Sequence, residues 1–281
     1  MTTPPPSVPR PRVVPLGRRA SVLLAIASAV GVVAFAWPFL GDPAGSQNLA
    51  HATDAPWIFV ALVPLLVAII FAELADGSLD SKAIALLGVL AACGAALRLP
   101  GGVGGFEPVL FLLIPAGRVL GRGFGFVLGA VTLFASAVIT GGVGPWLPFQ
   151  MIGAAWVGFG AGCLPRCGGR RELVMLAGYG MAAGLAYGAL MNLWFWPFGS
   201  SGGTAISYDP SATAGENLHS YVVFYLTTSL GWDLLRSTGL VASVLVMAPA
   251  VLAALHRVSR RAAFGAPVQF NASDERSEVK N

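Results

Sequence analysis

The sequence predicts an all-α polytopic membrane protein with about eight transmembrane helices, and three observations support this fold class. Of the 281 residues, 56% are hydrophobic and only 11% are charged, whereas soluble domains carry about 25% charged residues. The mean hydropathy is +0.74. The 36 glycines and 20 prolines lie among apolar runs, where membrane helices contain them more often than soluble helices do.

Eight apolar runs approach the length of about 20 residues that a bilayer crossing needs. They lie at about 20–40, 57–75, 82–98, 106–120, 123–140, 148–165, 172–196 and 221–256. The fourth and fifth runs are the least separated, because Gly121-Arg122-Gly123 leaves almost no loop. Ala34-Phe35-Ala36 resembles a signal-peptide cleavage site, and cleavage there would leave seven spans. The apolar run is long for a signal peptide, so an uncleaved first helix is expected.

The distribution of positive charge predicts the orientation of these spans. With the N-terminus inside, 15 of the 17 basic residues fall on the cytoplasmic side, whereas Arg98 lies outside and Arg236 lies within the last span. An excess of Lys and Arg in cytoplasmic loops is the general rule for membrane proteins. We therefore expect a multi-pass protein of the cell membrane with both termini cytoplasmic. The net charge of +4 is then an orientation signal and does not indicate nucleic-acid binding.

Four regions follow from this pattern. Residues 1–19 are expected to form a disordered cytoplasmic tail, 20–81 two additional N-terminal helices, 82–256 a six-helix core, and 257–281 a polar cytoplasmic tail.

The stretch Gly141–Gln150 contains three glycines and two prolines between two apolar runs. Irregular backbone at membrane depth is tolerated only where it is buried in protein or lines a water-filled cavity. Trp146, Phe149 and Gln150 would give such a cavity aromatic faces and an amide. With Asn192 and Trp196 of the segment Met191–Pro197, they predict a solute site with aromatic walls at the outer end of the bundle.

Ionisable residues within spans are costly and are functional candidates. Asp233 and Arg236 lie three residues apart on one face of the last predicted helix. They form either an internal ion pair that pins two helices together or a site at which Arg236 meets an anionic solute while Asp233 holds its side chain. Glu107 precedes Pro108 at the outer surface, where it either complements the helix dipole, pairs with Arg98, or contacts the solute.

Small residues recur every fourth position on three of the predicted helices, and such ridges allow close helix packing. They are Gly121, Gly125 and Gly129; Gly180, Gly184 and Gly188; and Gly88, Ala92 and Ala96. The last ridge is flanked by Ala91 and Ala95, and on a lipid-facing helix it would suit docking of a partner subunit.

Residues 82–256 resemble the substrate-binding S component of energy-coupling-factor (ECF) vitamin transporters. The resemblance rests on the order and spacing of four segments: the small-residue helix Leu87–Ala96, Phe106–Gly117, the glycine-spaced helix start Gly121–Gly129, and the glycine-rich Trp156–Pro165. Residues 1–81 depart from the usual six-span plan of that family.

The resemblance implies that the chain binds a vitamin or related micronutrient at its external face and works with a transmembrane coupling protein and two cytoplasmic ATPase subunits. It further implies that the coupling protein docks on the ridge formed by Gly88, Ala91, Ala92, Ala95 and Ala96. The chain has no phosphate-binding loop of its own, so any ATP would bind another subunit.

No catalytic, metal or cofactor motif stands out, and we do not expect an enzyme. The three histidines are scattered, His-Glu-x-x-His is missing, and Cys163 and Cys167 lack a second pair of zinc ligands. Two alternatives stay open. One is a proton-coupled secondary transporter that uses Asp233 or Glu107, and the other is a membrane scaffold that transports nothing.

Overall fold

The computed structural model describes residues 17–40, 64–65, 68, 81–99, 107–199 and 204–262, and this part of the chain contains helices and no strand. The helices are α1 (Arg18–Leu40), α3 (Ser81–Arg98), α4 (Pro108–Leu120), α5 (Arg122–Thr140), α6 (Leu147–Cys163), α7 (Arg170–Gly199), α8 (Ala214–Phe224) and α9 (Leu230–Ala262), with a π-helical segment η2 (Tyr225–Ser229) between the last two.

Five helical segments of this part are long and apolar enough to cross a membrane, namely 18–40, 81–98, 122–140, 170–199 and the continuous 214–260. The predicted all-α, membrane-type architecture is confirmed at this level. The number of eight spans is not confirmed, because α4, with 13 residues, and α6, with 17, are shorter than the five, and most of the predicted span 57–75 lies outside the described residues.

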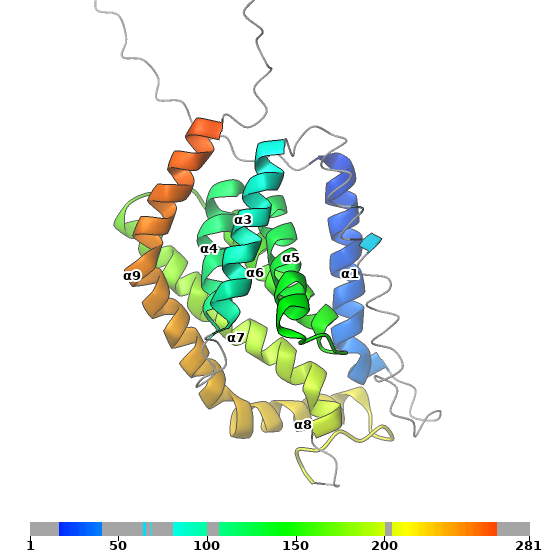
Figure 1. The fold of residues 1–281 in the computed structure, drawn as a ribbon. Helices are drawn as coiled ribbons and strands as arrows, with labels where there is room; N and C mark the ends of the chain where they lie inside the picture. Colours follow the sequence, from blue (N-terminus) through cyan, green and yellow to red (C-terminus); the bar gives the residue numbers. More distant parts are fainter. Residues whose placement is uncertain are drawn as a thin grey trace, which may run out of the picture.

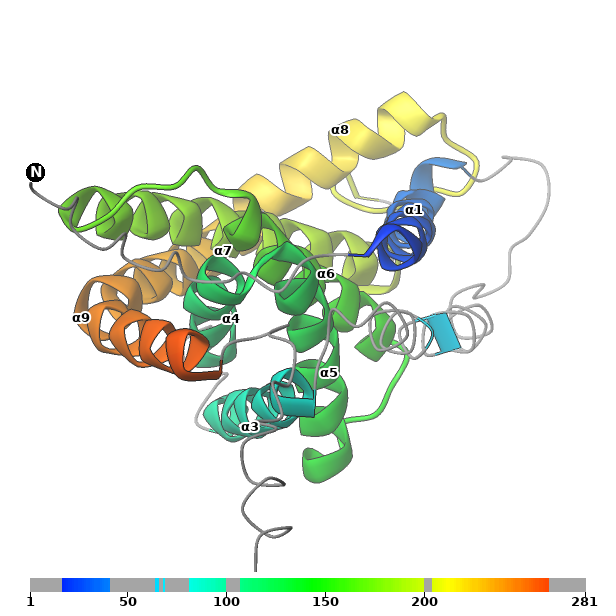
Figure 2. The ribbon, with the colours of Figure 1, turned by 90° about the horizontal axis from the view of Figure 1, so that it is seen from above.

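Helix α4 lies at the centre of the bundle, in contact with α3, α5, α6, α7 and α9 (Figures 1 and 2). Every residue of α4 except Arg118 is buried. Its sequence is apolar on all sides, which is the pattern of a helix enclosed by other helices. A helix of 13 residues can therefore be stable here through packing alone.

Glycines bring α4, α5 and α6 into backbone contact. A Cβ atom added at Gly117 or Gly125 would overlap the carbonyl oxygen of Gly158, and one added at Gly129 would overlap that of Ala154. Small residues are needed wherever helix backbones approach this closely. The packing role predicted for the ridge on α5 is confirmed at Gly125 and Gly129.

A single residue, Gly121, connects α4 to α5. Its φ of 105° lies in a region that residues with a side chain rarely adopt. Glycine therefore allows the chain to reverse without a loop, which explains why the two apolar runs are so poorly separated in the sequence.

The last helix of the chain is bent. Helix α8 lies across one end of the bundle, and α9 rises from it along α7 and α4 (Figure 1). The bend coincides with η2, and π-helical turns are a recognised cause of helix kinks. The predicted run 172–196 ends too early and the predicted run 221–256 begins too late. Helix α7 continues to Gly199, and α8 begins at Ala214.

The two ends of the bundle differ in their content of basic residues and of connecting segments. The start of α1, the start of α3 and the end of α9 lie together at the top of Figure 1. We call this the basic end, and its described basic residues are Arg18, Arg19, Lys82, Arg118, Arg122, Arg166, Arg170, Arg171, Arg257 and Arg260. The opposite end, the loop end, carries the turn at 141–146, the segment 204–213 and α8. Residues 257–262, predicted as tail, belong to α9.

Helix α1, the first of the two additional helices, packs on α6, α7 and α8. The indole nitrogen of Trp156 donates a hydrogen bond to the Ser28 hydroxyl over 3.1 Å. Phe35 packs edge-on against Phe149, with ring centroids 5.1 Å apart. These contacts make α1 an integral part of the bundle and not an appendage to the core.

Candidate functional site

A glycine on α7 makes room for a carboxyl group on α9. Gly188 faces Asp233 so closely that a Cβ atom at position 188 would overlap the carboxyl group. One turn further along, Gly184 faces Ser237 in the same way. The close packing predicted for the ridge on α7 is confirmed at these two glycines, its partner is α9, and Asp233 lies at the helix interface with only 1% of its side chain exposed.

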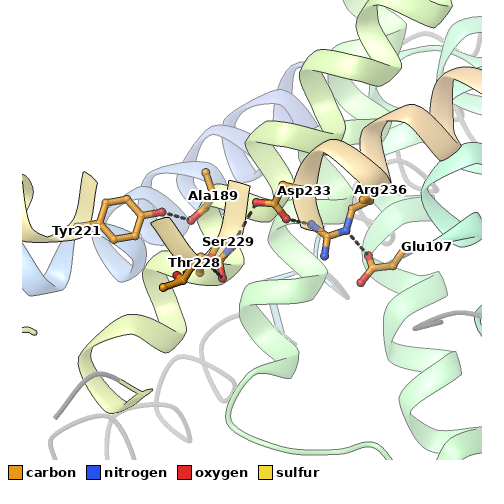
Figure 3. Close-up of polar contacts among 8 residues, drawn as sticks. Glu107, Ala189, Tyr221, Thr228, Ser229, Asp233 and Arg236 are labelled. Carbon is orange, nitrogen blue, oxygen red and sulfur yellow. Dashed lines mark hydrogen bonds and ion pairs between the residues drawn. The ribbon is translucent and has the colours of Figure 1, made fainter. Parts of the chain in front are cut away.

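Asp233 is held by several donors. The Arg236 guanidinium donates from Nη1 to Asp233 Oδ1, and Asn192 donates from Nδ2 to Oδ2 over 3.2 Å (Figure 3). The Tyr225 hydroxyl is a further hydrogen-bond partner. A charge buried this deeply is costly unless it is paired and hydrogen-bonded, and Asp233 is both. The contact between Asp233 and Arg236, which both interpretations of the three-residue spacing require, is present.

The polar network continues into the bend of the last helix. Asn192 accepts a hydrogen bond at Oδ1 from the Ser229 hydroxyl over 3.1 Å, and Ser229 lies 3.1 Å from the Thr228 hydroxyl. On the other side of the bend, the Tyr221 hydroxyl donates to the carbonyl oxygen of Ala189 (Figure 3). The π-helical segment η2 is thereby bonded to α7 on both sides, and such segments are frequent at functional sites.

Arg236 faces a second carboxylate, that of Glu107. Oε2 of Glu107 lies 4.0 Å from Nε of Arg236 (Figure 3). The Glu107 side chain is 28% exposed and makes no capping hydrogen bond to α4, so it does not act as a helix cap through its side chain. The charges of Arg236 and Arg98 both act on the Glu107 carboxylate. The Tyr187 ring lies under the Arg236 guanidinium at 6.0 Å.

Arg98, at the end of α3, pairs with α6. Its Nη2 donates to Oε1 of Gln150 over 2.8 Å. Its buried Nη1 has no hydrogen-bond partner among the described residues. Because the charge of Arg98 also acts on Glu107, the carboxylate of Glu107 lies in the field of two guanidinium groups from different helices.

An aromatic cluster adjoins this polar one. The Trp194 ring packs against Trp146, Phe149 and Phe198, with centroids 6.4, 5.9 and 5.9 Å apart respectively. The indole nitrogen of Trp194 is buried and has no hydrogen-bond partner among the described residues. Trp146 is 38% exposed, and Phe149 is buried.

The first turns of α6 connect the two clusters. Phe149 belongs to the aromatic cluster, the neighbouring Gln150 binds Arg98, and a Cβ atom at Gly153 would touch the Tyr187 ring. The start of α6 therefore contacts both the aromatic cluster around Trp194 and the charged residue Arg98.

The structure thus places the predicted site residues in four locations. Glu107, Asn192 and Arg236 lie in one polar network, and Trp146 and Phe149 lie in the aromatic cluster. Gln150 binds Arg98 at the junction between them. Trp196 is fully buried elsewhere: its indole nitrogen donates to the carbonyl oxygen of Ile206, and its ring packs on Tyr208 and Tyr221. In this position Trp196 anchors the segment after α7.

Four residues of the network were missed as site candidates: Arg98, Tyr187, Tyr225 and Ser229. Arg98 carried a usable signal, because it is the one basic residue that the charge pattern places outside. The other three carry none, because a tyrosine or serine in an apolar helix is common. The packing of α7 on α9 brings Tyr187 to Arg236, and the π-helical segment η2 brings Ser229 to Asn192.

The small-residue ridge on α3 divides into two faces. Gly88, Ala92 and Ala96 are exposed, and nothing lies within 4 Å of a Cβ atom added at Gly88. Ala91 and Ala95 are buried against the bundle. Of the two registers that the sequence left open, the one through Gly88, Ala92 and Ala96 faces outward.

The described residues contain no group of three or more His, Cys, Asp or Glu side chains that could hold a metal ion. Comparison of the chain with known proteins finds no matching family, no matching curated protein and no matching solved structure.

Proposed function

We propose that the chain is the substrate-binding membrane subunit of an ATP-driven transporter of the ECF type, and that it binds a vitamin-type solute at its outer face. The observation that carries this proposal is the buried network of Asp233, Arg236 and Asn192 near the loop end. Ionisable groups inside membrane proteins mark solute and ion pathways. A few placed polar groups beside aromatic walls are typical of small-molecule sites.

In this proposal, Arg236 binds an anionic group of the solute, and Asp233 and Asn192 fix the guanidinium in place. Trp146, Phe149 and Trp194 contact a flat ring of the solute. Gln150 and Glu107 border the site through Arg98 and Arg236. Trp196 does not contact the solute in this proposal. It fixes the segment after α7 through its hydrogen bond to the carbonyl oxygen of Ile206.

The proposed orientation puts the basic end in the cytoplasm, with both termini, and the loop end outside. The crowding of described Lys and Arg residues at one end of the bundle supports it. The chain would then be a multi-pass protein of the cell membrane, with no catalytic activity of its own.

The proposed partners are a transmembrane coupling protein and two cytoplasmic ATPase subunits. The outward face of α3 at Gly88, Ala92 and Ala96 supports docking of the coupling protein, because small exposed residues let another helix approach closely.

The test is purification of the tagged chain from its native membrane in a mild detergent, followed by identification of the associated proteins and by uptake measurements in vesicles. We expect a multi-pass partner and ATPase subunits to co-purify, and uptake to require ATP. Uptake that continues without the ATPases and stops when the proton gradient is dissipated would contradict the proposal.

That second outcome would favour a proton-coupled carrier. The observation that supports this alternative is Glu107, a partly exposed carboxylate that lies 4.0 Å from Nε of Arg236. A carboxyl group that changes its protonation near an internal cation is a common element of proton-coupled transport.

A further inference from the structure

The guanidinium of Arg236 lies between two carboxylates that differ in how firmly they are held. Asp233 is 1% exposed and is bound by Arg236, Asn192 and Tyr225. Glu107 is 28% exposed and reaches Nε of Arg236 only at 4.0 Å, beyond hydrogen-bond distance. The buried Nε of Arg236 has no hydrogen-bond partner among the described residues. The guanidinium is thus bonded to Asp233 through Nη1, whereas Nε, on the side toward Glu107, makes no hydrogen bond to the described residues.

The charges of this region cancel. Arg98 and Arg236 contribute two positive charges, and Glu107 and Asp233 contribute two negative charges. An anionic solute group that joined this set would leave one negative charge in excess. In a poorly hydrated environment such an excess is costly, and it is relieved most simply if one carboxylate takes up a proton.

We propose that Glu107 occupies the place on Arg236 that an anionic group of the solute takes, and that it leaves this place by binding a proton when the solute arrives. This inference rests on the proposed function and specifies its substrate class, an organic anion with a carboxylate. Glu107 is thereby a specificity-determining residue that competes with the solute.

Glu107, and not Asp233, is the carboxylate that takes up the proton and leaves Arg236. Protonating Asp233 would remove the charge that pairs with Arg236 and would turn one of the two oxygens that accept from α7, α9 and η2 into a donor. Removing the charge of Glu107 breaks only the long contact to Arg236. The groups that act on Glu107 are Arg98 from α3, Tyr187 from α7, and Asp233 and Arg236 from α9.

The direction of the pH dependence follows from this assignment. A bound anion adds a like charge near Glu107 and so favours the protonated form of its carboxyl group. The complex therefore holds more protons than the free protein. Affinity for an ionised solute accordingly rises as the pH falls below the pKa that Glu107 has in the complex. It declines as the pH rises.

The experiment compares wild type with Glu107→Gln, which keeps the shape of the side chain and removes its charge. Purified proteins are titrated with benzoate and with its uncharged analogue benzamide, and binding is followed by tryptophan fluorescence between about pH 6 and pH 8, where a carboxylate of ordinary pKa stays ionised. Asp209→Asn is the matched control, because it removes one negative charge from an exposed residue in the segment after α7.

We expect Glu107→Gln to bind benzoate about 10-fold more tightly than wild type at the upper pH, since a neighbouring like charge shifts such equilibria by about 10-fold or more. The pH dependence seen in wild type should be lost in Glu107→Gln and kept in Asp209→Asn. Benzamide should bind all three proteins equally.

Benzoate binding to Glu107→Gln that is no tighter than to wild type would overturn the inference, as would absence of benzoate binding to both. If benzamide binds in either case, an aromatic solute site is still present and the proposed function stands. Failure of both probes together with absence of any co-purifying solute would overturn the proposed function as well.

Discussion

Gly188 of α7 and Asp233 of α9 occupy one shared space: the missing side chain of the glycine is the room in which the aspartate carboxyl group lies. Asp233 is therefore buried at a helix contact where it reaches Asn192 on α7 and Arg236 on its own helix. A packing feature, the glycine ridge, and a chemical feature, the charged network, depend on each other at this point.

We expect Gly188→Ala to push α9 away from α7 and to displace Asp233. Overpacking of this kind costs about 1–3 kcal/mol, so the thermal unfolding midpoint should fall and solute binding should be lost. Gly178→Ala on the same helix is the control, because nothing lies within 4 Å of a Cβ atom there. Equal midpoints for Gly188→Ala and wild type would show that the close contact is not required.

Arg236→Gln alone should destabilise the protein by about 3–5 kcal/mol, because it leaves the Asp233 carboxylate buried without its cation. The double variant Asp233→Asn with Arg236→Gln should recover most of this loss, since the buried charge of Asp233 is removed together with its cation. A double-mutant cycle measured by chemical denaturation in detergent checks this coupling. Simply additive effects of the two changes would contradict it.

Arg118 links three points at the basic end. It bonds Glu172 over 2.7 Å and the carbonyl oxygens of Leu164 and Cys167 over 2.9 and 3.2 Å. We expect Arg118→Lys to lower the unfolding midpoint, because an ammonium group cannot reproduce the planar fork of a guanidinium. Arg166→Lys, at an exposed position, should have no effect. Solute binding should persist in both, and its loss in Arg118→Lys would contradict the placement of the site near the loop end.

A leucine at Ala92 should leave folding and solute binding unchanged and should reduce recovery of the partner subunits during purification. Ala92 is exposed on α3, whereas Ala91 beside it is 3% exposed and packs inward. Ala91→Leu should therefore lower the unfolding midpoint. Unchanged recovery of the partners with Ala92→Leu would exclude this face as the docking surface.

Helix positions in the described part could largely be predicted from apolar runs. The run 123–140 corresponds to α5 at Arg122–Thr140, and the run 148–165 corresponds to α6 at Leu147–Cys163. The start of α8 was missed although Thr213 and Glu216 form a capping box, a signal that the sequence displays as Thr-x-x-Glu. The weak apolar character of Ala214–Ser220 hid this signal, because the prediction relied on hydropathy.

The site could be predicted only in part. The spacing of Asp233 and Arg236 fixes their pairing on one helix, so that contact was predictable. The contact of Arg236 with Glu107 joins positions 129 residues apart in the chain and depends on how α9 packs against α4. The π-helical turn at η2, which brings Ser229 to Asn192, has no sequence signature comparable to a proline kink.

The most direct test of the central claim, that the network around Arg236 binds a solute, is mass spectrometry of small molecules released from purified protein. Wild type is compared with the double variant Asp233→Asn with Arg236→Gln, which is expected to fold, and with Arg166→Lys. We predict that one organic solute with an aromatic ring and a carboxylate is released from wild type and from Arg166→Lys and is missing from the double variant. Retention of the same solute by a folded double variant, in the same amount per protein, would contradict the claim.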